Sequence, residues 1–152
     1  MKPGKANQRI IADRLDFITR MLGDIRSLPL GSLEEFMRDR RNIGAAESCL
    51  RRSLEALLDL GRHVLAKVFL QAVTEYKKVA DELEAQNILS HESARRLRIL
   101  AGYRNRLVHF YHEVTSQELY QICTHELDDL MVVREAFVEW IKANPDCIDT
   151  TV

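Results

Sequence analysis

The residues with the clearest chemical potential lie in one octapeptide, RNRLVHFY, which runs from Arg104 to Tyr111. Histidine titrates near neutral pH, so His109 can accept or donate a proton during a reaction. The planar, permanently charged guanidinium of Arg104 is suited to binding a phosphate. Cleavage of RNA by its own 2′-hydroxyl needs these two groups, a proton acceptor and a cation beside the phosphate oxygens. The octapeptide therefore predicts a phosphate-handling site with Arg104 and His109 as catalytic residues and no metal ion.

Arg104 occupies an unusual position for a charged residue. At about 100° per residue on a helix, six neighbours fall within roughly 60° of it, namely Leu97, Leu100, Ala101, Leu107, Val108 and Tyr111. A guanidinium in such an apolar stripe is costly to bury without a partner, so we expect an anionic group beside it. Asn105 lies four residues before His109 and so on the same face, where it can orient the imidazole.

Helix geometry separates the two catalytic candidates. On an ideal helix the side chains of Arg104 and His109 point about 140° apart. They can meet at one phosphate if the helix loosens near His109, or if a second copy of the chain completes the site. A two-fold dimer would bring two such motifs to one cleft. Tyr111, seven residues after Arg104, returns to within roughly 20° of the same face on a continuing helix.

Each of these residues taken alone also has a purely structural interpretation. His109 could be a helix C-terminal histidine that only interacts with the helix dipole. Tyr111 could be a core-edge residue with its hydroxyl in solvent. A metal pair of His109 and His112 lacks a third ligand at a suitable spacing. Asp59 and His63, four residues apart, are either a local surface pair or a support for the site.

Amphipathic segments with a helical period surround the octapeptide and must position it. We expect a helix over 7–28, a capping box at Ser32–Glu35 with a short helical turn, a long helix to about residue 67, and helices over 74–87, 90–111 and 115–143. Gly61 within the long helix suggests that another helix approaches closely there. The pattern predicts an all-α, antiparallel up-down bundle of about five helices. It forms one domain spanning 1–152, with flexible segments at 1–6 and 146–152.

Composition gives no global sign of a nucleic-acid partner, because the net charge of the 152-residue chain is −1. Arginines are nevertheless concentrated in two places. The first group lies between Ser90 and Tyr111 and comprises Arg95, Arg96, Arg98, Arg104 and Arg106. The second group comprises Arg38, Arg40, Arg41, Arg51 and Arg52. These are either solvated helix faces or, for the first group, a surface that steers phosphates.

The cysteines and the hydropathy of the sequence indicate in which cellular compartment the protein is expected. Cys49, Cys123 and Cys147 are odd in number and lack C-x-x-C spacing, which argues against a disulfide framework and a zinc site and favours the reducing cytoplasm. The sequence shows neither a leader-like segment nor an apolar run of membrane-spanning length, so we expect neither export nor membrane insertion.

The spacing of Arg104, Asn105, His109 and Tyr111 matches the pattern R-N-x-x-x-H-x-Y. In these residues the chain resembles the HepT-like toxins of the HEPN superfamily of helical ribonucleases. The stretch EALLDLGRHVLAK, residues 55–67, is similar to that group's second helix, and the resemblance covers most of residues 7–143. It implies a HEPN-type homodimer with one histidine from each protomer at the interface. It also implies a metal-independent toxin ribonuclease that leaves a cyclic phosphate.

The resemblance further implies a partner and a switch. The partner would be a small MntA-like nucleotidyltransferase antitoxin of a type VII-like toxin–antitoxin system, which attaches AMP to Tyr111 as O-AMP-tyrosine. Tyr111 would otherwise contact substrate, and the bulky, anionic nucleotide would fill the cleft. No cofactor is expected. The alternative is a non-catalytic helical substrate-binding or docking subunit of a nucleotidyltransferase, although such a subunit has no need of the intact motif.

Overall fold

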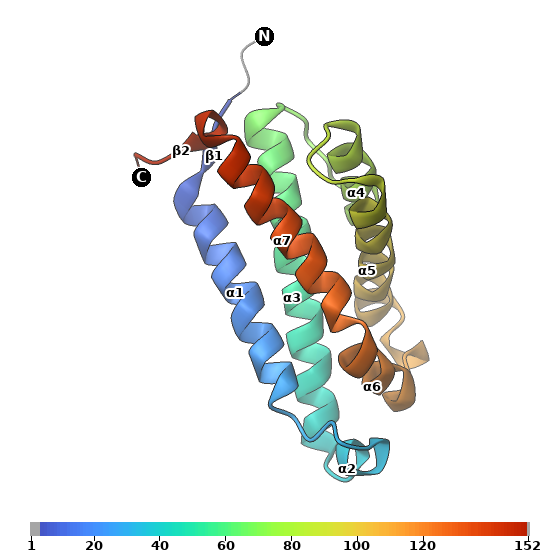
Figure 1. Ribbon diagram of the computed structural model, residues 1–152. Coiled ribbons are helices and arrows are strands. Elements are labelled where there is room, and N and C mark those ends of the chain that lie inside the picture. Colours follow the sequence, from blue (N-terminus) through green and yellow to red (C-terminus); the bar gives the residue numbers. More distant parts are fainter. Residues whose placement is uncertain (1–3, 152) are drawn as a thin grey trace.

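The computed structural model describes residues 4–151 and consists of packed helices (Figure 1). Within these residues there are seven α-helices, and the predicted all-α up-down bundle is confirmed. The helices are α1 (Gln8–Arg26), α2 (Leu33–Met37), α3 (Arg40–Val68), α4 (Tyr76–Ala85), α5 (His91–His109), α6 (Ser116–His125) and α7 (Leu127–Ala143). Two 3₁₀ turns, η1 (Tyr111–Glu113) and η2 (Pro145–Cys147), and two short strands, β1 (Ala6–Asn7) and β2 (Ile148–Asp149), complete the fold.

The central element is α3, whose 29 residues pack against α1, α2, α4, α5 and α6. Its apolar stripe is buried, which stabilises the bundle by about 1.5–3 kcal/mol for each large side chain. Gly61 lies where α4 crosses. A Cβ atom there would stand 2.9 Å from side-chain atoms of both Val79 and Leu83. The predicted close approach of a second helix at Gly61 is therefore confirmed.

Side-chain caps fix where the site-bearing helices begin. The hydroxyl of Ser90 accepts a hydrogen bond from the Ser93 N–H at 3.1 Å and starts α5. Thr115 accepts from the Glu118 N–H at 3.1 Å and starts α6. Asn87 ends the preceding turn with φ of 59°, a left-handed conformation that asparagine tolerates. Each of these signals was readable from the sequence because the cap geometry is local.

The expectation of one helix over 115–143 is wrong, because the helix is interrupted at Glu126 between α6 and α7. Two residues before the break the Thr124 hydroxyl donates to the Tyr120 carbonyl at 2.8 Å, a side-chain bond that often bends helices. The break lets α7 run along α5 while α6 packs against α2 and α3. The hydrophobic period continues through the break, which is why the sequence did not reveal it.

The ends of the described chain are tied together rather than free. Ala6 pairs with Ile148 and Asn7 with Asp149 in a parallel two-stranded sheet, and Ala6 is fully buried. This differs from the expectation of flexible segments at 1–6 and 146–152, of which residues 1–3 and 152 lie outside the described residues. Figure 1 shows β1 and β2 side by side at one end of the bundle. No helix among residues 4–151 has the length and hydropathy needed to cross a membrane.

Candidate active site

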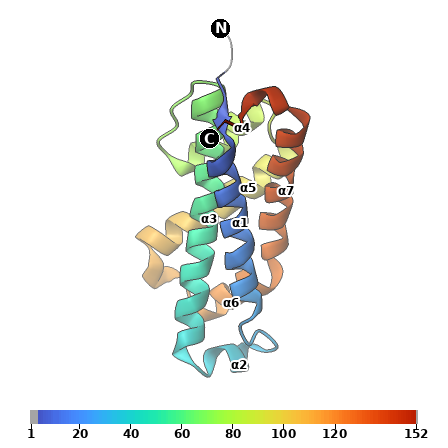
Figure 2. The ribbon, with the colours of Figure 1, turned by 90° about the vertical axis from the view of Figure 1, so that its left-hand side faces the viewer.

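A cleft of about 500 Å³ lies where the end of α5 meets α3 and the start of α4. It is lined by Arg62, Thr74, Glu75, Tyr76, Lys77, Arg104, Asn105, His109 and Phe110. Figure 2 shows the end of α5 and η1 (tan) extending past α3 to one side of the bundle. Three of the four motif residues, Arg104, Asn105 and His109, therefore line one cavity within a single chain.

Arg104 and His109 line the same cleft, although on an ideal helix their side chains point about 140° apart. The helix α5 ends at His109, and the next residue, Phe110, has non-helical φ and ψ of −132° and 39°. The loop before α4 supplies the opposite wall, so one hollow spans the last turn and a half of α5. The helix stays regular through His109, so convergence of the two side chains on one phosphate by a loosened helix stays a prediction. The second route, completion by another copy, also stays a prediction.

The anion expected beside Arg104 is Glu55 of α3. Its Oε1 lies 3.7 Å from the Arg104 Nε, and the arginine side chain is only 19 % exposed. The Arg104 Nη1 donates to the Asn105 Oδ1 at 3.2 Å. Asn105 thus orients the guanidinium in this structure, rather than the imidazole as expected. The buried Arg104 Nε has no hydrogen-bond partner, so Glu55 compensates its charge without completing its bonding.

Tyr76, the first residue of α4, forms an aromatic platform for the guanidinium. The Arg104 Cζ lies 4.5 Å from the centre of the Tyr76 ring, and that of Arg62 lies 5.4 Å away. Such contacts stabilise by about 0.5–2 kcal/mol, depending on burial. The Tyr76 hydroxyl donates to the Asp59 Oδ1 at 2.6 Å. Burial and this hydrogen bond to Asp59 raise the pKa of Tyr76 to about 12, so its hydroxyl stays protonated at neutral pH.

The sequence did not assign functional roles to Tyr76 or Glu55. The signal that could have found them is the arginine on the apolar stripe, which requires an acid and favours an aromatic neighbour. The sequence offers several acids at suitable helix faces, and only the packing of α3, α4 and α5 selects among them.

Asp59 and His63 do not form the local pair that was one of the two expectations. Asp59 accepts from Tyr76 and lies 3.7 Å from the Arg62 Nη1. His63 instead accepts a hydrogen bond from the Asn7 N–H through its Nε2 at 3.0 Å. Asp59 therefore supports Tyr76 in the wall of the cleft, whereas His63 holds the start of α1 against α3.

Tyr111 lies outside the cleft, and the expectation that it continues the helix beside Arg104 is wrong. It begins η1 after α5 has ended, is 65 % exposed, and contacts the ring of His112 edge-on. Its neighbour Phe110 is 50 % exposed. Together they leave two aromatic rings in solvent at the end of α5, which is costly unless something else covers them.

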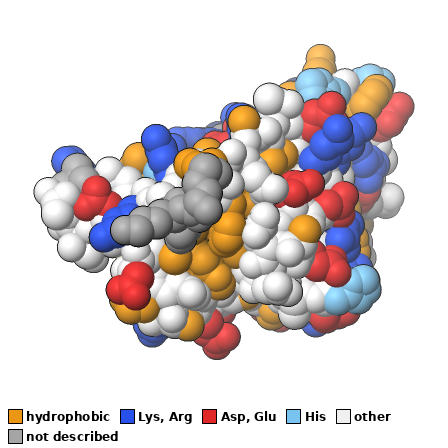
Figure 3. Space-filling model, turned by 90° about the horizontal axis from the view of Figure 1, so that it is seen from above, with side chains coloured by type: hydrophobic (Ala, Val, Ile, Leu, Met, Phe, Trp, Pro, Cys, Tyr) orange, Lys and Arg blue, Asp and Glu red, His pale blue; other side chains and the backbone are white. Residues whose placement is uncertain are grey.

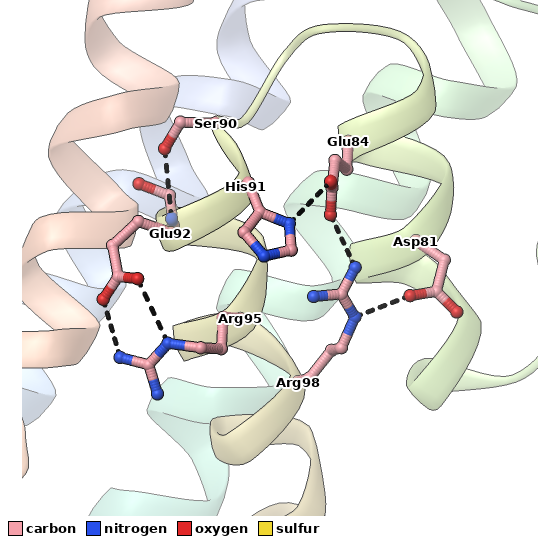
Figure 4. Close-up of polar contacts among 8 residues, drawn as sticks. Asp81, Glu84, Ser90, His91, Glu92, Arg95 and Arg98 are labelled. Atoms are coloured by element: carbon pink, nitrogen blue, oxygen red, sulfur yellow. Dashed lines mark hydrogen bonds and ion pairs between the residues drawn. The ribbon is translucent and has the colours of Figure 1, made fainter.

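The arginines of α5 are mostly paired with acids of the chain itself. Figure 4 shows Arg98 reaching Asp81 and Glu84 of α4 while Arg95 binds Glu92 of its own helix. Arg96 lies 3.5 Å from Asp129, and Arg106 pairs with Glu118. These contacts join α5 to its neighbours and leave little free charge, so they do not support a phosphate-steering surface there. Figure 3, viewed toward the end that carries β1 and β2, likewise shows basic and acidic side chains interspersed.

The potential metal ligands of residues 4–151 are His, Cys, Asp and Glu side chains. No group of three or more His, Cys, Asp or Glu side chains there is arranged to hold a metal ion. Cys49, Cys123 and Cys147 are free thiols, and burial raises the pKa of Cys123 to about 12.

Two curated proteins similar to this chain carry nuclease names. The "tRNA nuclease HepT" of Aphanizomenon flos-aquae is 27 % identical over 119 residues, which cover 78 % of this chain and 80 % of that protein. The "mRNA nuclease HepT" of Shewanella oneidensis is 25 % identical over 134 residues, covering 88 % of this chain and 97 % of that protein.

Solved structures show the same fold. A tri-AMPylated Shewanella oneidensis HEPN toxin in complex with MNT antitoxin has a TM-score of 0.74 and is 25 % identical, covering 88 % of this chain and 97 % of that one. The Bacillus subtilis cytosolic protein YutE has a TM-score of 0.79 at 18 % identity, covering 96 % and 98 %. The family model described as "Ribonuclease HepT-like" matches residues 18–137, which include the cleft and the octapeptide. The chain accordingly belongs to the HepT-like ribonuclease family.

Proposed function

We propose that this chain is the ribonuclease toxin of a toxin–antitoxin pair and that it cuts RNA in the cleft with Arg104 and His109. The observation that carries the proposal is that both side chains line one cavity together with Lys77 and Arg62. Membership of the HepT-like family and the nuclease names of its relatives favour this function over a docking subunit.

The proposed reaction uses no metal ion. His109 accepts the proton of a ribose 2′-hydroxyl, whose oxygen attacks the adjacent phosphorus. The bond from phosphorus to the 5′-oxygen breaks, the departing oxygen takes up a proton, and a 2′,3′-cyclic phosphate remains. Acid–base catalysis of this kind contributes about 10²- to 10⁴-fold. Arg104 stabilises the negative charge that grows on the phosphate oxygens. Its Nη2 makes no hydrogen bond among the described residues, whereas Nη1 is held by Asn105.

The proposed switch is AMP on Tyr111, added by an MntA-like nucleotidyltransferase. Exposure of the Tyr111 ring supports it, because a partner enzyme can reach the hydroxyl without unfolding the bundle. A similar Shewanella toxin was solved in its tri-AMPylated form with MNT antitoxin. Tyr111 follows His109 by two residues, so an attached nucleotide would place its phosphate at the mouth of the cleft and exclude substrate.

The proposed assembly is a homodimer in the cytoplasm. Exposed Phe110 and Tyr111 beside the cleft favour a second copy as their cover. The free cysteines and the need to reach RNA favour the cytoplasm. Sedimentation at micromolar concentration measures the assembly, and a fully active monomer would contradict it.

The experiment that tests the function uses purified protein and total RNA in EDTA. We expect cleavage by the wild-type chain, products with cyclic phosphate ends, and none from His109→Ala prepared in parallel. Loss of wild-type cleavage in EDTA would contradict the metal-independent reaction. Equal cleavage by His109→Ala would contradict the site. Toxicity on expression, abolished by the same substitution, separates the nuclease from a docking subunit.

A further inference from the structure

The cleft continues into a groove that crosses α3 and reaches α1. The cleft shares Arg62 and Thr74 with a shallower hollow on α3, and that hollow shares Asp59 with a groove of about 240 Å³. This last groove is lined by Arg14 and Phe17 of α1 and by Arg52 of α3, among others. The three hollows adjoin through these shared residues and follow one another along α3, from His109 to the space between α1 and α3.

The far end of this path carries arginines whose charge the chain does not neutralise. Arg14 and Arg52 of this groove are exposed, as is Arg20 of the adjoining hollow that shares Arg14 and Phe17 with it. None of the three forms an ion pair among the described residues. This contrasts with the acid-paired arginines of α5. The acids in the floor are already engaged, because Glu55 binds Arg51 at 2.9 Å and Asp59 accepts from Tyr76.

An aromatic ring holds two of these arginines in place. The Cζ of Arg52 lies 5.2 Å from the centre of the Phe17 ring, and that of Arg20 lies 5.7 Å from it. Planar guanidiniums stacked on a ring present flat faces for bases and donors for phosphates. Asp13 and Asp16 line the adjoining hollow on α1 together with Arg14 and Arg20.

We infer that this surface, the α1–α3 groove (Arg14, Phe17, Arg20 and Arg52), binds the part of an RNA strand that flanks the cleaved bond. The inference rests on the proposed function, in that the strand in the groove is the substrate of the cleft. Arg52 and Arg62 are ten residues apart on α3, which is about 15 Å along the helix axis. The groove thus holds more than one nucleotide beyond the cleft.

Continuity with the cleft favours RNA over an acidic protein surface as the occupant. An RNA chain cut in its interior must leave the cleft in two directions, and the path over α3 provides one of them. Unpaired arginines interleaved with an aromatic ring are the usual platform for single-stranded nucleic acid. A protein partner would need the arginines but not their connection to His109.

Binding measurements in the His109→Ala background test this without requiring cleavage. The probe is a labelled oligouridylate of about twelve nucleotides, within the range of single-strand site sizes, followed by fluorescence anisotropy at increasing salt. The groove variant carries Arg14→Gln, Arg20→Gln and Arg52→Gln. The matched control carries Arg9→Gln, Arg40→Gln and Lys142→Gln, three exposed cations outside the groove that also form no ion pair among the described residues. Both lose the same net charge, and circular dichroism verifies their helical content.

Each of three phosphate contacts contributes about 0.7 to the slope of log affinity against log salt for a single strand. In the groove variant we expect the slope of log affinity against log salt to be about two units less steep than in the His109→Ala parent. The control variant should keep the slope of the parent. Equal slopes in the two variants, or no binding by the parent chain, would overturn the inference. Weakened antitoxin binding with unchanged RNA binding would assign the groove to a protein partner instead. If RNA binding depends on the groove but the wild-type chain cleaves no RNA, the proposed function is contradicted and the inference that the groove binds RNA is supported.

Discussion

The guanidinium carbon of Arg104 lies 4.5 Å from the centre of the Tyr76 ring, and the Tyr76 hydroxyl donates a 2.6 Å hydrogen bond to Asp59. Side chains of α3, α4 and α5 therefore meet at a single arginine. A cation fixed in this way needs little reorganisation when a phosphate becomes more negative during reaction. The uncharged ring holds the guanidinium without adding to the charge compensation that Glu55 already provides at 3.7 Å.

Replacing Tyr76 with leucine should remove this platform. A lost cation–π contact of about 0.5–2 kcal/mol lowers kcat roughly 2- to 30-fold, while KM changes less. Tyr76→Phe keeps the ring and loses only the bond to Asp59, so its kcat should stay near the wild-type value. Steady-state cleavage of a labelled RNA measures both constants. Equal losses of kcat in the two variants, or losses that follow the melting temperature, would reduce Tyr76 to a packing residue.

Arg104→Ala and His109→Ala should each lower RNA cleavage at least about 100-fold, the smaller end of the effect of removing a catalytic group. The helical content should be largely unchanged, because His109 is exposed and Glu55 keeps Arg51 as a partner. Circular dichroism and an RNase assay on the same preparations decide the matter. Two variants as active as the wild type would end the catalytic assignment.

Tyr111→Phe should escape modification by the antitoxin, since it lacks the oxygen that accepts AMP. Intact mass spectrometry after co-expression with the nucleotidyltransferase reads the mass gain directly. Tyr103→Phe is the matched control, because Tyr103 lies on α5, the helix that precedes Tyr111, but is half-buried and outside the motif. The control should gain the full mass. A gain that persists undiminished in Tyr111→Phe would place the switch elsewhere.

Stability should fall in mild acid because of His63. Its Nε2 accepts the Asn7 N–H, and burial, with Lys67 and Arg14 nearby, lowers the pKa of His63 in the folded state below its ordinary 6.5. The unfolded chain therefore binds the proton more readily, and this contribution is present above about pH 6.5 and is lost as the pH drops toward the lowered value.

The size of the His63 effect should be about 1 kcal/mol, the usual net value of one hydrogen bond. Chemical denaturation from pH 7.5 to 5 measures it. In His63→Gln an amide oxygen can still accept the Asn7 bond but does not titrate, so that variant should lose less stability over the same interval. Identical pH profiles for the two chains would show that His63 contributes nothing to the acid sensitivity.

Local signals in the sequence were reliable guides to this fold. The caps at Ser90 and Thr115 and the apolar period of α3 were each decided by a few neighbouring residues. The break at Glu126 was missed because the apolar period runs through it. The parallel pairing of β1 with β2 was missed because it joins segments about as far apart as the chain allows, and two residues per strand carry too little pattern.

In the candidate site, too, the residues carried by one local motif were predicted and those contributed by other helices were not. The motif identified Arg104, Asn105 and His109, which share the cleft, because one helix end carries all three. It could not identify Tyr76, which comes from another helix. It also placed Tyr111 wrongly, since the sequence extended α5 to that residue and the structure ends the helix at His109.

The place where α5 ends gives its two catalytic candidates unequal anchoring. Arg104 lies among packed side chains, whereas His109 is exposed in the final turn, where amide hydrogens exchange readily and helices fray. Under the proposed function, opening of that turn would leave the phosphate-binding arginine in place and remove the proton-transferring histidine. The chain would then have access to a state that holds RNA without cutting it. Its population is set by the stability of one helical turn, and any partner that orders the end of α5 raises the fraction competent for cleavage.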